Sequence, residues 1–96
     1  MQMWYFEDIP LQQERTTRAY VVPEAELIAF ARRWDPLPIH TDTEAAKASA
    51  HGGLIAPATY VLAMATALIA ELDPKLAVSG GSDWKVQFLL PVRPAD

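Results

Sequence analysis

The stretch that decides the fold of this chain is Asp35-Pro36-Leu37-Pro38-Ile39-His40-Thr41-Asp42. It places a carboxylate and an imidazole five positions apart, across a segment that two prolines stiffen. Each proline fixes its own φ and disfavours helix in the residue before it. We therefore expect Asp35 and His40 to be held by a semi-rigid loop rather than by a helix face. Such a loop can direct an acid and a base at one point, as proton transfer requires.

A second informative stretch, Gly52-Gly53-Leu54-Ile55-Ala56-Pro57, leads into a long uncharged run. We expect this run to form a helix over about 56–72, the longest element of the chain. The first N–H groups of a helix have no partner inside the helix, so they can stabilise a developing oxyanion. The start of this helix is therefore a candidate substrate-binding element.

Together the two stretches resemble the MaoC-type dehydratases, which are hot-dog relatives of the (R)-specific enoyl-CoA hydratases. The motif of that family is Asp, any residue, Asn or Gln, Pro, an apolar residue, His, any residue and Asp, and it corresponds here to 35–42. An alanine-rich segment and a Gly-Leu-Ile-Ala lead-in follow, as in the family. The resemblance runs from about Tyr5 to the closing Leu90-Pro91-Val92-Arg93-Pro94-Ala95-Asp96. It implies an α+β fold, in which an antiparallel sheet wraps around a long central helix.

The resemblance also implies a reaction, the hydration of a trans-2-enoyl thioester or the reverse dehydration. Asp35 and His40 would hold a water, one acting as base and the other delivering a proton to the α-carbon, and both assignments stay open. The backbone N–H of Ala58 would polarise the thioester carbonyl, with Gly53 and Ile55 beside it as oxyanion-binding or substrate-binding residues. The substrate would be an acyl-CoA or acyl-carrier thioester, and no cofactor is implied.

The chain departs from the family's pattern at two places. The hydratase pattern usually has a glycine preceded by a histidine where Ala58 and Pro57 stand here, and the alanine methyl group narrows the approach to the N–H. Leu37 replaces an amide that can hydrogen-bond around the site. Asp42 occupies the second acidic position, and we expect it to act as a helix N-cap.

Two other functions stay open. A hot-dog thioesterase usually places its carboxylate on or near the central helix, and the run 56–70 offers none. A non-catalytic subunit or fragment is the third hypothesis, because Leu37 and Ala58 depart from the pattern and few strands are evident.

Composition narrows the class of protein. The chain has 96 residues, 51% of them hydrophobic, which suits one small domain with a core. Its net charge of −4 argues against a nucleic-acid partner. The absence of cysteine fits a reducing compartment, so we expect a cytoplasmic protein.

The same sequence argues against a membrane or metal protein. The acidic N-terminal segment lacks the positive region of a secretory signal. The uncharged run is shorter than the roughly 20 residues that span a bilayer. His51 has no second His or Cys at metal-ligand spacing, so we expect a loop residue and no metal. We interpret Lys85 and Arg93 as surface charges.

Local patterns predict the remaining elements. β-Branched and aromatic residues favour a strand over 13–22, and alternating apolar residues favour another over 84–90. Between them, Pro23 precedes a helix that Pro36 stops near Trp34 or Asp35. Its apolar stripe consists of Leu27, Ile28, Ala31 and Trp34.

A second, short helix is expected over about 43–49, because Thr41 and Glu44 form a capping box. We expect Gly52 and Gly53 to allow a backbone conformation that other residues disfavour, rather than to bind a ligand directly. We also expect a loop over Ser79–Ser82.

A sheet that wraps the central helix needs more strands than these two. We interpret 1–96 as a single MaoC-like hot-dog domain whose C-terminal strands are missing. The chain could be truncated, completed by a second chain, or a fragment with another packing. In complete relatives the sheets of two protomers join edge to edge, so we expect a homodimer or a higher homo-oligomer.

Overall fold

The chain is organised around one long helix. The computed structural model describes residues 3–77 and 84–95. Its helices are α1 (Glu24–Trp34), α2 (Pro38–Thr41), α3 (Thr43–Ala48) and α4 (Ala58–Ala70). A short 3₁₀ turn, Phe6–Asp8, and a parallel pair of two-residue strands, β1 (Met3–Trp4) and β2 (Lys75–Leu76), complete the described elements.

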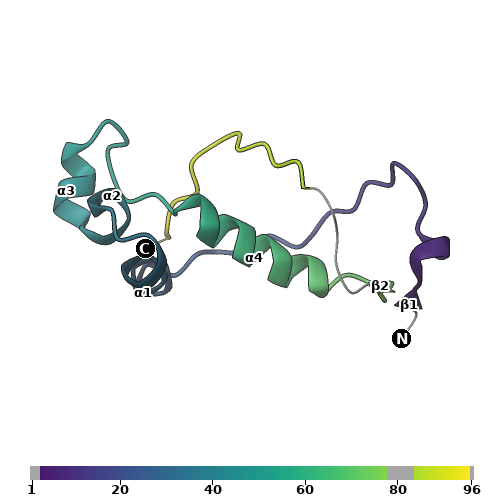
Figure 1. Cartoon of the computed structure of the whole chain (residues 1–96). Coiled ribbons are helices and arrows are strands. Elements are labelled where there is room, and N and C mark those ends of the chain that lie inside the picture. Colours follow the sequence, from purple (N-terminus) through teal and green to yellow (C-terminus); the bar gives the residue numbers. More distant parts are fainter. Residues whose placement is uncertain (1–2, 78–83, 96) are drawn as a thin grey trace.

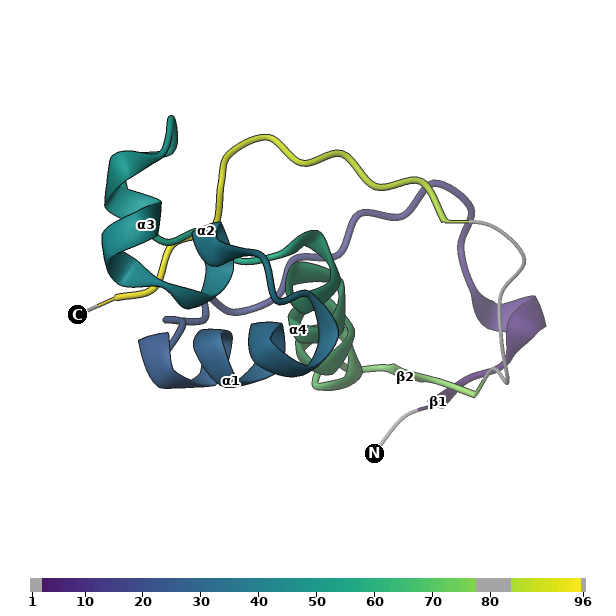
Figure 2. The same cartoon turned by 60° about the vertical axis from the view of Figure 1, so that its left-hand side comes forward.

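The helices α1, α2 and α3 gather at one end of α4, and the two short strands lie at the other end (Figure 1). The segment 84–95 returns along α4, as Figure 2 shows from a second side. The molecule measures 50 × 25 × 23 Å and has a radius of gyration of 16.2 Å. A compact domain of about 100 residues has a radius near 13 Å, so this chain is extended for its length.

Helix α1 forms where the sequence predicts it. Its first turn carries Glu24 and Glu26 and its last turn Arg32 and Arg33, so the charges complement the helix dipole. The α1 residues Leu27 and Ala31 have no exposed surface. Trp34 does not belong to the buried stripe, because 62% of it is exposed at the end of the helix, where the guanidinium of Arg33 lies 4.8 Å from its ring.

The segment predicted as a loop between Asp35 and Asp42 contains the one-turn helix α2. Pro38 occupies its first position, with Leu37 as N-cap. A proline at this position has the φ that a helix needs and lacks an N–H that would otherwise go unpaired. The expectation that His40 stands on a loop is therefore wrong, since the same proline that limits the preceding residue starts a helix after it.

Helix α3 forms as predicted, but its cap is Asp42 rather than Thr41. The Asp42 side chain accepts hydrogen bonds from the backbone N–H groups of Glu44 and Ala45, at 3.0 and 3.1 Å. The Thr41 hydroxyl instead donates to the carbonyl of Leu37 at 3.2 Å. The N-cap role expected for Asp42 is confirmed.

Helix α4 is two residues shorter at each end than the predicted range 56–72. Pro57 is its N-cap, and the Pro57 carbonyl accepts the first helical hydrogen bond from Val61 at 3.2 Å. Helix α1 packs against α4. The hydrophobic core that results consists of Val22, Leu27, Ala56 and Tyr60, with Phe30 edge-to-face on Tyr60.

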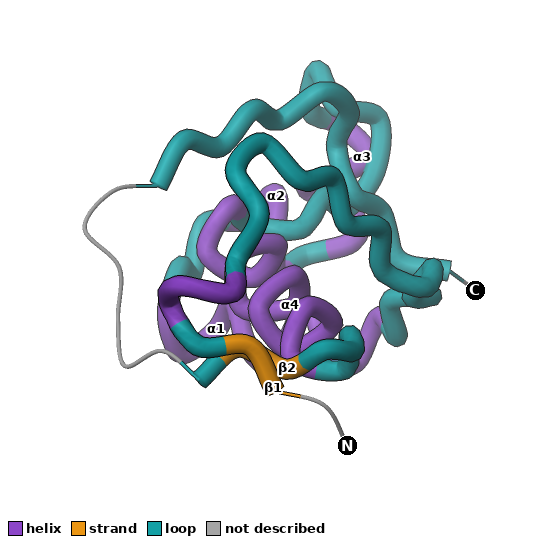
Figure 3. The backbone as a smooth tube through the Cα atoms, turned by 90° about the vertical axis from the view of Figure 1, so that its right-hand side faces the viewer, coloured by secondary structure: helices purple, strands orange, loops and turns teal. Residues whose placement is uncertain are grey.

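Neither predicted strand forms as a strand in the described residues. The segments 13–22 and 84–90 run without regular structure (Figure 3). A single bridge joins Pro23 to Ala95, with the Ala95 N–H donating to the Val22 carbonyl at 3.0 Å. The reason is physical: a strand makes its hydrogen bonds to a neighbouring strand, and the described residues offer none beside these segments. The predicted loop Ser79–Ser82 lies outside the described residues.

Candidate active site

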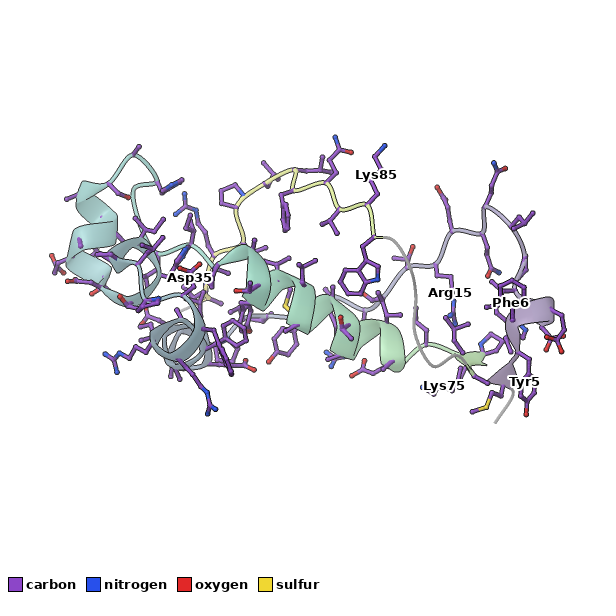
Figure 4. The ribbon with its side chains drawn as sticks, viewed as in Figure 1. Tyr5, Phe6, Arg15, Asp35, Lys75 and Lys85 are labelled. Atoms are coloured by element: carbon purple, nitrogen blue, oxygen red, sulfur yellow. The ribbon has the colours of Figure 1, made fainter. Side chains whose placement is uncertain are left out.

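The structure brings His40 of α2 and Asp35 at the end of α1 close together. Figure 4 labels Asp35, which lies near the start of α4. His40 lies on α2 and is 95% buried, with 5% of its surface exposed. Its Nδ1 lies 2.7 Å from the Ile55 carbonyl oxygen. Because a carbonyl only accepts hydrogen bonds, Nδ1 carries the proton. This contact leaves Nε2 as the ring nitrogen that can exchange a proton.

Asp35 presents its carboxylate to that nitrogen. Oδ2 of Asp35 lies 3.6 Å from Nε2 of His40. This distance exceeds that of a direct N–H···O hydrogen bond, and it permits one water to bond to both atoms. About a third of the Asp35 side chain is exposed, so the pair opens to solvent on the carboxylate side.

Local structure fixes the Asp35 backbone. Asp35 follows the last turn of α1, and its N–H donates to the Ala31 carbonyl at 2.8 Å. Its own carbonyl accepts from the Leu37 N–H at 2.9 Å, which turns the chain into α2. The end of one helix and the start of the next therefore set the separation of the two side chains.

Ile55 supports the imidazole, a role that the sequence did not suggest. Its carbonyl accepts from His40, and its N–H donates to the Ile39 carbonyl at 3.3 Å. This N–H therefore already has a partner within the chain. The sequence carries no signal for a backbone carbonyl of this kind, because any residue provides one.

Ala58 begins α4 and is exposed, so its N–H is accessible as a first-turn donor. It lines a mostly apolar cavity of about 260 Å³ between the start of α4 and the returning segment, and neither Asp35 nor His40 lines that cavity. The lining residues are Ala56, Ala58, Val61, Phe88, Leu89, Leu90, Pro91 and Val92.

Gly52 serves backbone geometry, as expected. Gly52 has a φ of 70°, which a side chain would strain. Gly53 lies against the Arg93 guanidinium, because a Cβ added there would be 3.3 Å from Nη1 of Arg93. Leu37 is 53% exposed and caps α2.

Sequence reasoning missed a second polar cluster, formed by Tyr20, Glu26 and Tyr60. Both tyrosine hydroxyls donate to Oε2 of Glu26, at 2.7 Å from Tyr20 and 3.2 Å from Tyr60. Burial and the negative charge of Glu26 raise the pKa of Tyr60 to about 12. The hydrogen bond to Glu26 likewise raises the pKa of Tyr20. These hydroxyls stay protonated near neutral pH, and the cluster joins the segment before α1 to α1 and joins α1 to α4.

Residues 3–77 and 84–95 contain no group of three His, Asp or Glu side chains placed to hold a metal ion. In the same residues, no helix has the length and apolar character that crossing a bilayer requires.

Comparison with known proteins gives a family and a structural relative. Residues 6–96 match the family model described as MaoC like domain. The crystal structure of the MaoC-like dehydratase from Rhodospirillum rubrum superposes with a TM-score of 0.79 at 30% identity, covering 95% of this chain and 63% of that one. The predicted hot-dog fold class is thereby confirmed.

Two curated relatives are also similar in sequence. A UPF0336 protein of Streptomyces avermitilis is 34% identical over 87 residues, and one of Streptomyces griseus subsp. griseus is 33% identical over 87 residues. Each match covers 83% of this chain and 58% of the relative. The chain thus spans less than two thirds of the length of these proteins.

Proposed function

The chain belongs to the MaoC-like dehydratase family, and on that premise we propose that it carries the catalytic pair of an acyl-thioester hydratase or dehydratase. The observation that supports this most directly is the Asp35–His40 geometry, with 3.6 Å between Oδ2 and Nε2 and the opposite ring nitrogen fixed on Ile55. The pair has the residue types and the spacing that hold one water between an acid and a base.

The reaction in the hydration direction needs one proton removed and one delivered. The base of the pair takes a proton from water, whose oxygen bonds to the β-carbon of a trans-2-enoyl thioester. The other member gives its proton to the α-carbon, so that water has been added and the pair still holds one proton in total. That proton then returns to its starting position through the next water, across the 3.6 Å between the two groups.

Negative charge develops on the thioester oxygen as water adds. We assign its stabilisation to the N–H of Ala58 at the start of α4, where a first-turn donor and the helix dipole act together. The apolar cavity beside Ala58 is then the place for the acyl portion of the substrate. Gly53 acts through the turn before the helix rather than by touching the substrate.

Crotonyl-CoA hydration tests this function, followed by the loss of absorbance of the conjugated enoyl thioester. Asp35→Asn and His40→Gln put an amide of similar size in place of a group that can take up or release a proton. Each should therefore lower kcat by about 100-fold or more. Asp73→Asn is the matched control, because Asp73 is an exposed carboxylate far from the pair in sequence. It should leave the rate unchanged.

The proposal fails if the wild-type chain hydrates the substrate and both pair variants retain its rate. It also fails if acyl-CoA releases free thiol without hydration, since that outcome identifies a thioesterase. The described α4 sequence contains no carboxylate for thioester hydrolysis, which is why hydration is the preferred reaction.

We further propose that the active form is a homodimer or a higher homo-oligomer. Large apolar side chains are exposed along the returning segment, and such contiguous exposure is typical of a surface that a second chain covers. Native mass measurement against the chain mass of 10.6 kDa tests this assembly. A lone monomer with full activity would contradict it.

A further inference from the structure

The returning segment is fastened to the turn that precedes α4. The Ala56 N–H donates to the Val92 carbonyl at 2.8 Å. Next along the chain, Nη2 of Arg93 donates to the His51 carbonyl at 2.6 Å, although 42 positions separate the two residues. The guanidinium also lies against Gly53, where a Cβ would stand only 3.3 Å from Nη1.

The fastened turn leads directly to the carbonyl that holds the imidazole. Only Gly52, Gly53 and Leu54 separate the Arg93-bound residue His51 from Ile55, and Leu54 is buried. The Ile55 carbonyl accepts from Nδ1 of His40, and so decides which ring nitrogen faces Asp35. A shift of this stretch would therefore change the tautomer or the orientation of His40.

Arg93 is consequently more than a surface charge. A guanidinium bound to a backbone carbonyl makes a charge-assisted hydrogen bond, which is stronger and more directional than a neutral one. Gly53 leaves room for that guanidinium, and a larger side chain there would push against it. Lys85 is a second exposed cation of the returning segment, and it bonds to no such carbonyl among the described residues.

We propose that Arg93 is a positioning residue for His40, acting through the turn 51–53 and the Ile55 carbonyl. By holding this turn, Arg93 keeps the proton of His40 on Nδ1 and leaves Nε2 to face the carboxylate of Asp35. The kinetic consequence rests on the proposed hydratase function, whereas the effect on the imidazole does not.

Two measurements on the intact chain test this assignment. Long-range ¹⁵N–¹H NMR correlations of the His40 ring report which nitrogen carries the proton, and crotonyl-CoA hydration reports the rate. In wild type the proton should be on Nδ1. Arg93→Gln should give a mixture of tautomers and lower kcat on the order of tenfold with KM little changed, because the reacting groups are misplaced rather than the substrate lost.

A second perturbation guards against a variant that simply fails to fold. Gly53→Ala keeps the charge but presses a methyl group towards Nη1 of Arg93, so it should move the ring signals in the same direction by a smaller amount. Arg93→Lys should recover part of the wild-type spectrum and rate, since an ammonium can reach one carbonyl. Lys85→Gln is the matched control and should change neither measurement.

The outcomes separate the two proposals. Altered ring signals without hydration in any form, wild type included, would support the positioning role and overturn the proposed function. Unaltered ring signals in Arg93→Gln and Gly53→Ala would overturn the positioning role, whatever happens to the rate.

Discussion

The helical region 23–72 and the two extended segments, 13–21 and 84–90, differ in how far their apolar side chains are covered. In the helical region, Leu27 and Ala31 are completely covered. In the extended segments, Val21 is 70% exposed and Leu90 is 81% exposed. A helix forms its backbone hydrogen bonds internally and needs only one covered face, whereas a strand needs a neighbour for its backbone as well. The same apolar content therefore forms a core in one region and an exposed surface in the other.

The two regions contribute differently to the candidate active site. Asp35, His40 and Ile55 all belong to the helical region, so their geometry is set by helices that form their backbone hydrogen bonds internally. The apolar cavity beside Ala58 depends on both regions, because α4 forms one wall and the segment 88–92 the other. We therefore expect the geometry of the Asp35–His40 pair to tolerate changes in the extended segments better than the proposed substrate affinity does.

Truncating one leucine in each region gives the strongest test of the comparison. Leu27→Ala should lower the free energy of unfolding by about 2–5 kcal/mol, because it leaves a cavity in the core. Leu90→Ala should change it by less than about 0.5 kcal/mol, because that side chain is already in solvent. Urea denaturation followed by circular dichroism measures both. Equal losses would mean that a second chain or a different packing covers Leu90.

Removing the Tyr60 hydroxyl tests how α4 is attached to α1. Tyr60→Phe takes away a partly buried hydrogen bond to the charged carboxylate of Glu26, which should cost about 1.5–3 kcal/mol at neutral pH. Tyr5→Phe is the control, since the Tyr5 side chain is exposed. A loss no larger than that of the control would show that the bond between Tyr60 and Glu26 does not stabilise the packing of α4 on α1.

The Tyr20–Glu26–Tyr60 cluster also predicts a loss of stability in alkali. The pKa of Tyr60 rises in the fold from 10.0 to about 12, so the folded chain binds this proton more tightly than the unfolded chain. The resulting stabilisation is complete below pH 10 and is lost as the pH rises towards 12. Thermal unfolding from pH 9 to 12 should show a falling Tm that is shallower in Tyr60→Phe. Parallel curves for the two proteins would contradict it.

The cap of α3 gives a smaller effect. Asp42→Ala should lower stability by about 1 kcal/mol, because two backbone N–H groups lose their acceptor. Thr41→Val should cost less stability, since the Leu37 carbonyl that accepts from the Thr41 hydroxyl keeps a second donor, the His40 N–H. Chemical denaturation distinguishes the two variants. A larger loss of unfolding free energy for Thr41→Val than for Asp42→Ala would mean that Thr41 caps α3, as the sequence predicted.

The smallest effect is expected at the ion pair between Arg18 and Glu71, which joins an extended segment to the end of α4. The two side chains bond at 2.7 and 3.0 Å, but both are about half exposed, so solvent and salt screen them. The hydrogen bond from Arg18 lowers the pKa of Glu71 below 4.5. The stability that the ion pair adds to the fold is thus present above pH 4.5 and is lost as the pH falls further. Arg18→Gln should lower Tm less than Asp42→Ala does, and salt should abolish the difference.

Most of the helical region could be predicted from local sequence. Pro23, the charges at the helix ends and Pro36 fixed α1, and the long uncharged run indicated α4 within two residues at each end. The helix α2 was missed because Pro38 can end an extended segment or begin a helix, and the sequence alone does not choose. Trp34 was assigned to the core because it matches the stripe, yet nothing packs over that end of α1 to exclude solvent.

The candidate site shows the same division. The residue types and spacing of Asp35 and His40 identified the pair, and their separation of 3.6 Å needed the turn between α1 and α2. The supporting contacts could not be read from the sequence. Ile55 acts through a backbone carbonyl, and Arg93 reaches a carbonyl 42 positions earlier.

By itself, the sequence determined that α1, α3 and α4 form helices, where Asp35 and His40 stand, and which family the chain resembles. These properties depend on neighbours within a few positions, such as a proline at a helix start or an aspartate at a cap. Only the tertiary structure decided that 13–22 and 84–90 lack strand partners in the described residues, which ring nitrogen of His40 faces Asp35, and what Arg93 binds. Each of these depends on contacts between distant positions, and the free energy of such contacts is set by what the complete fold brings together.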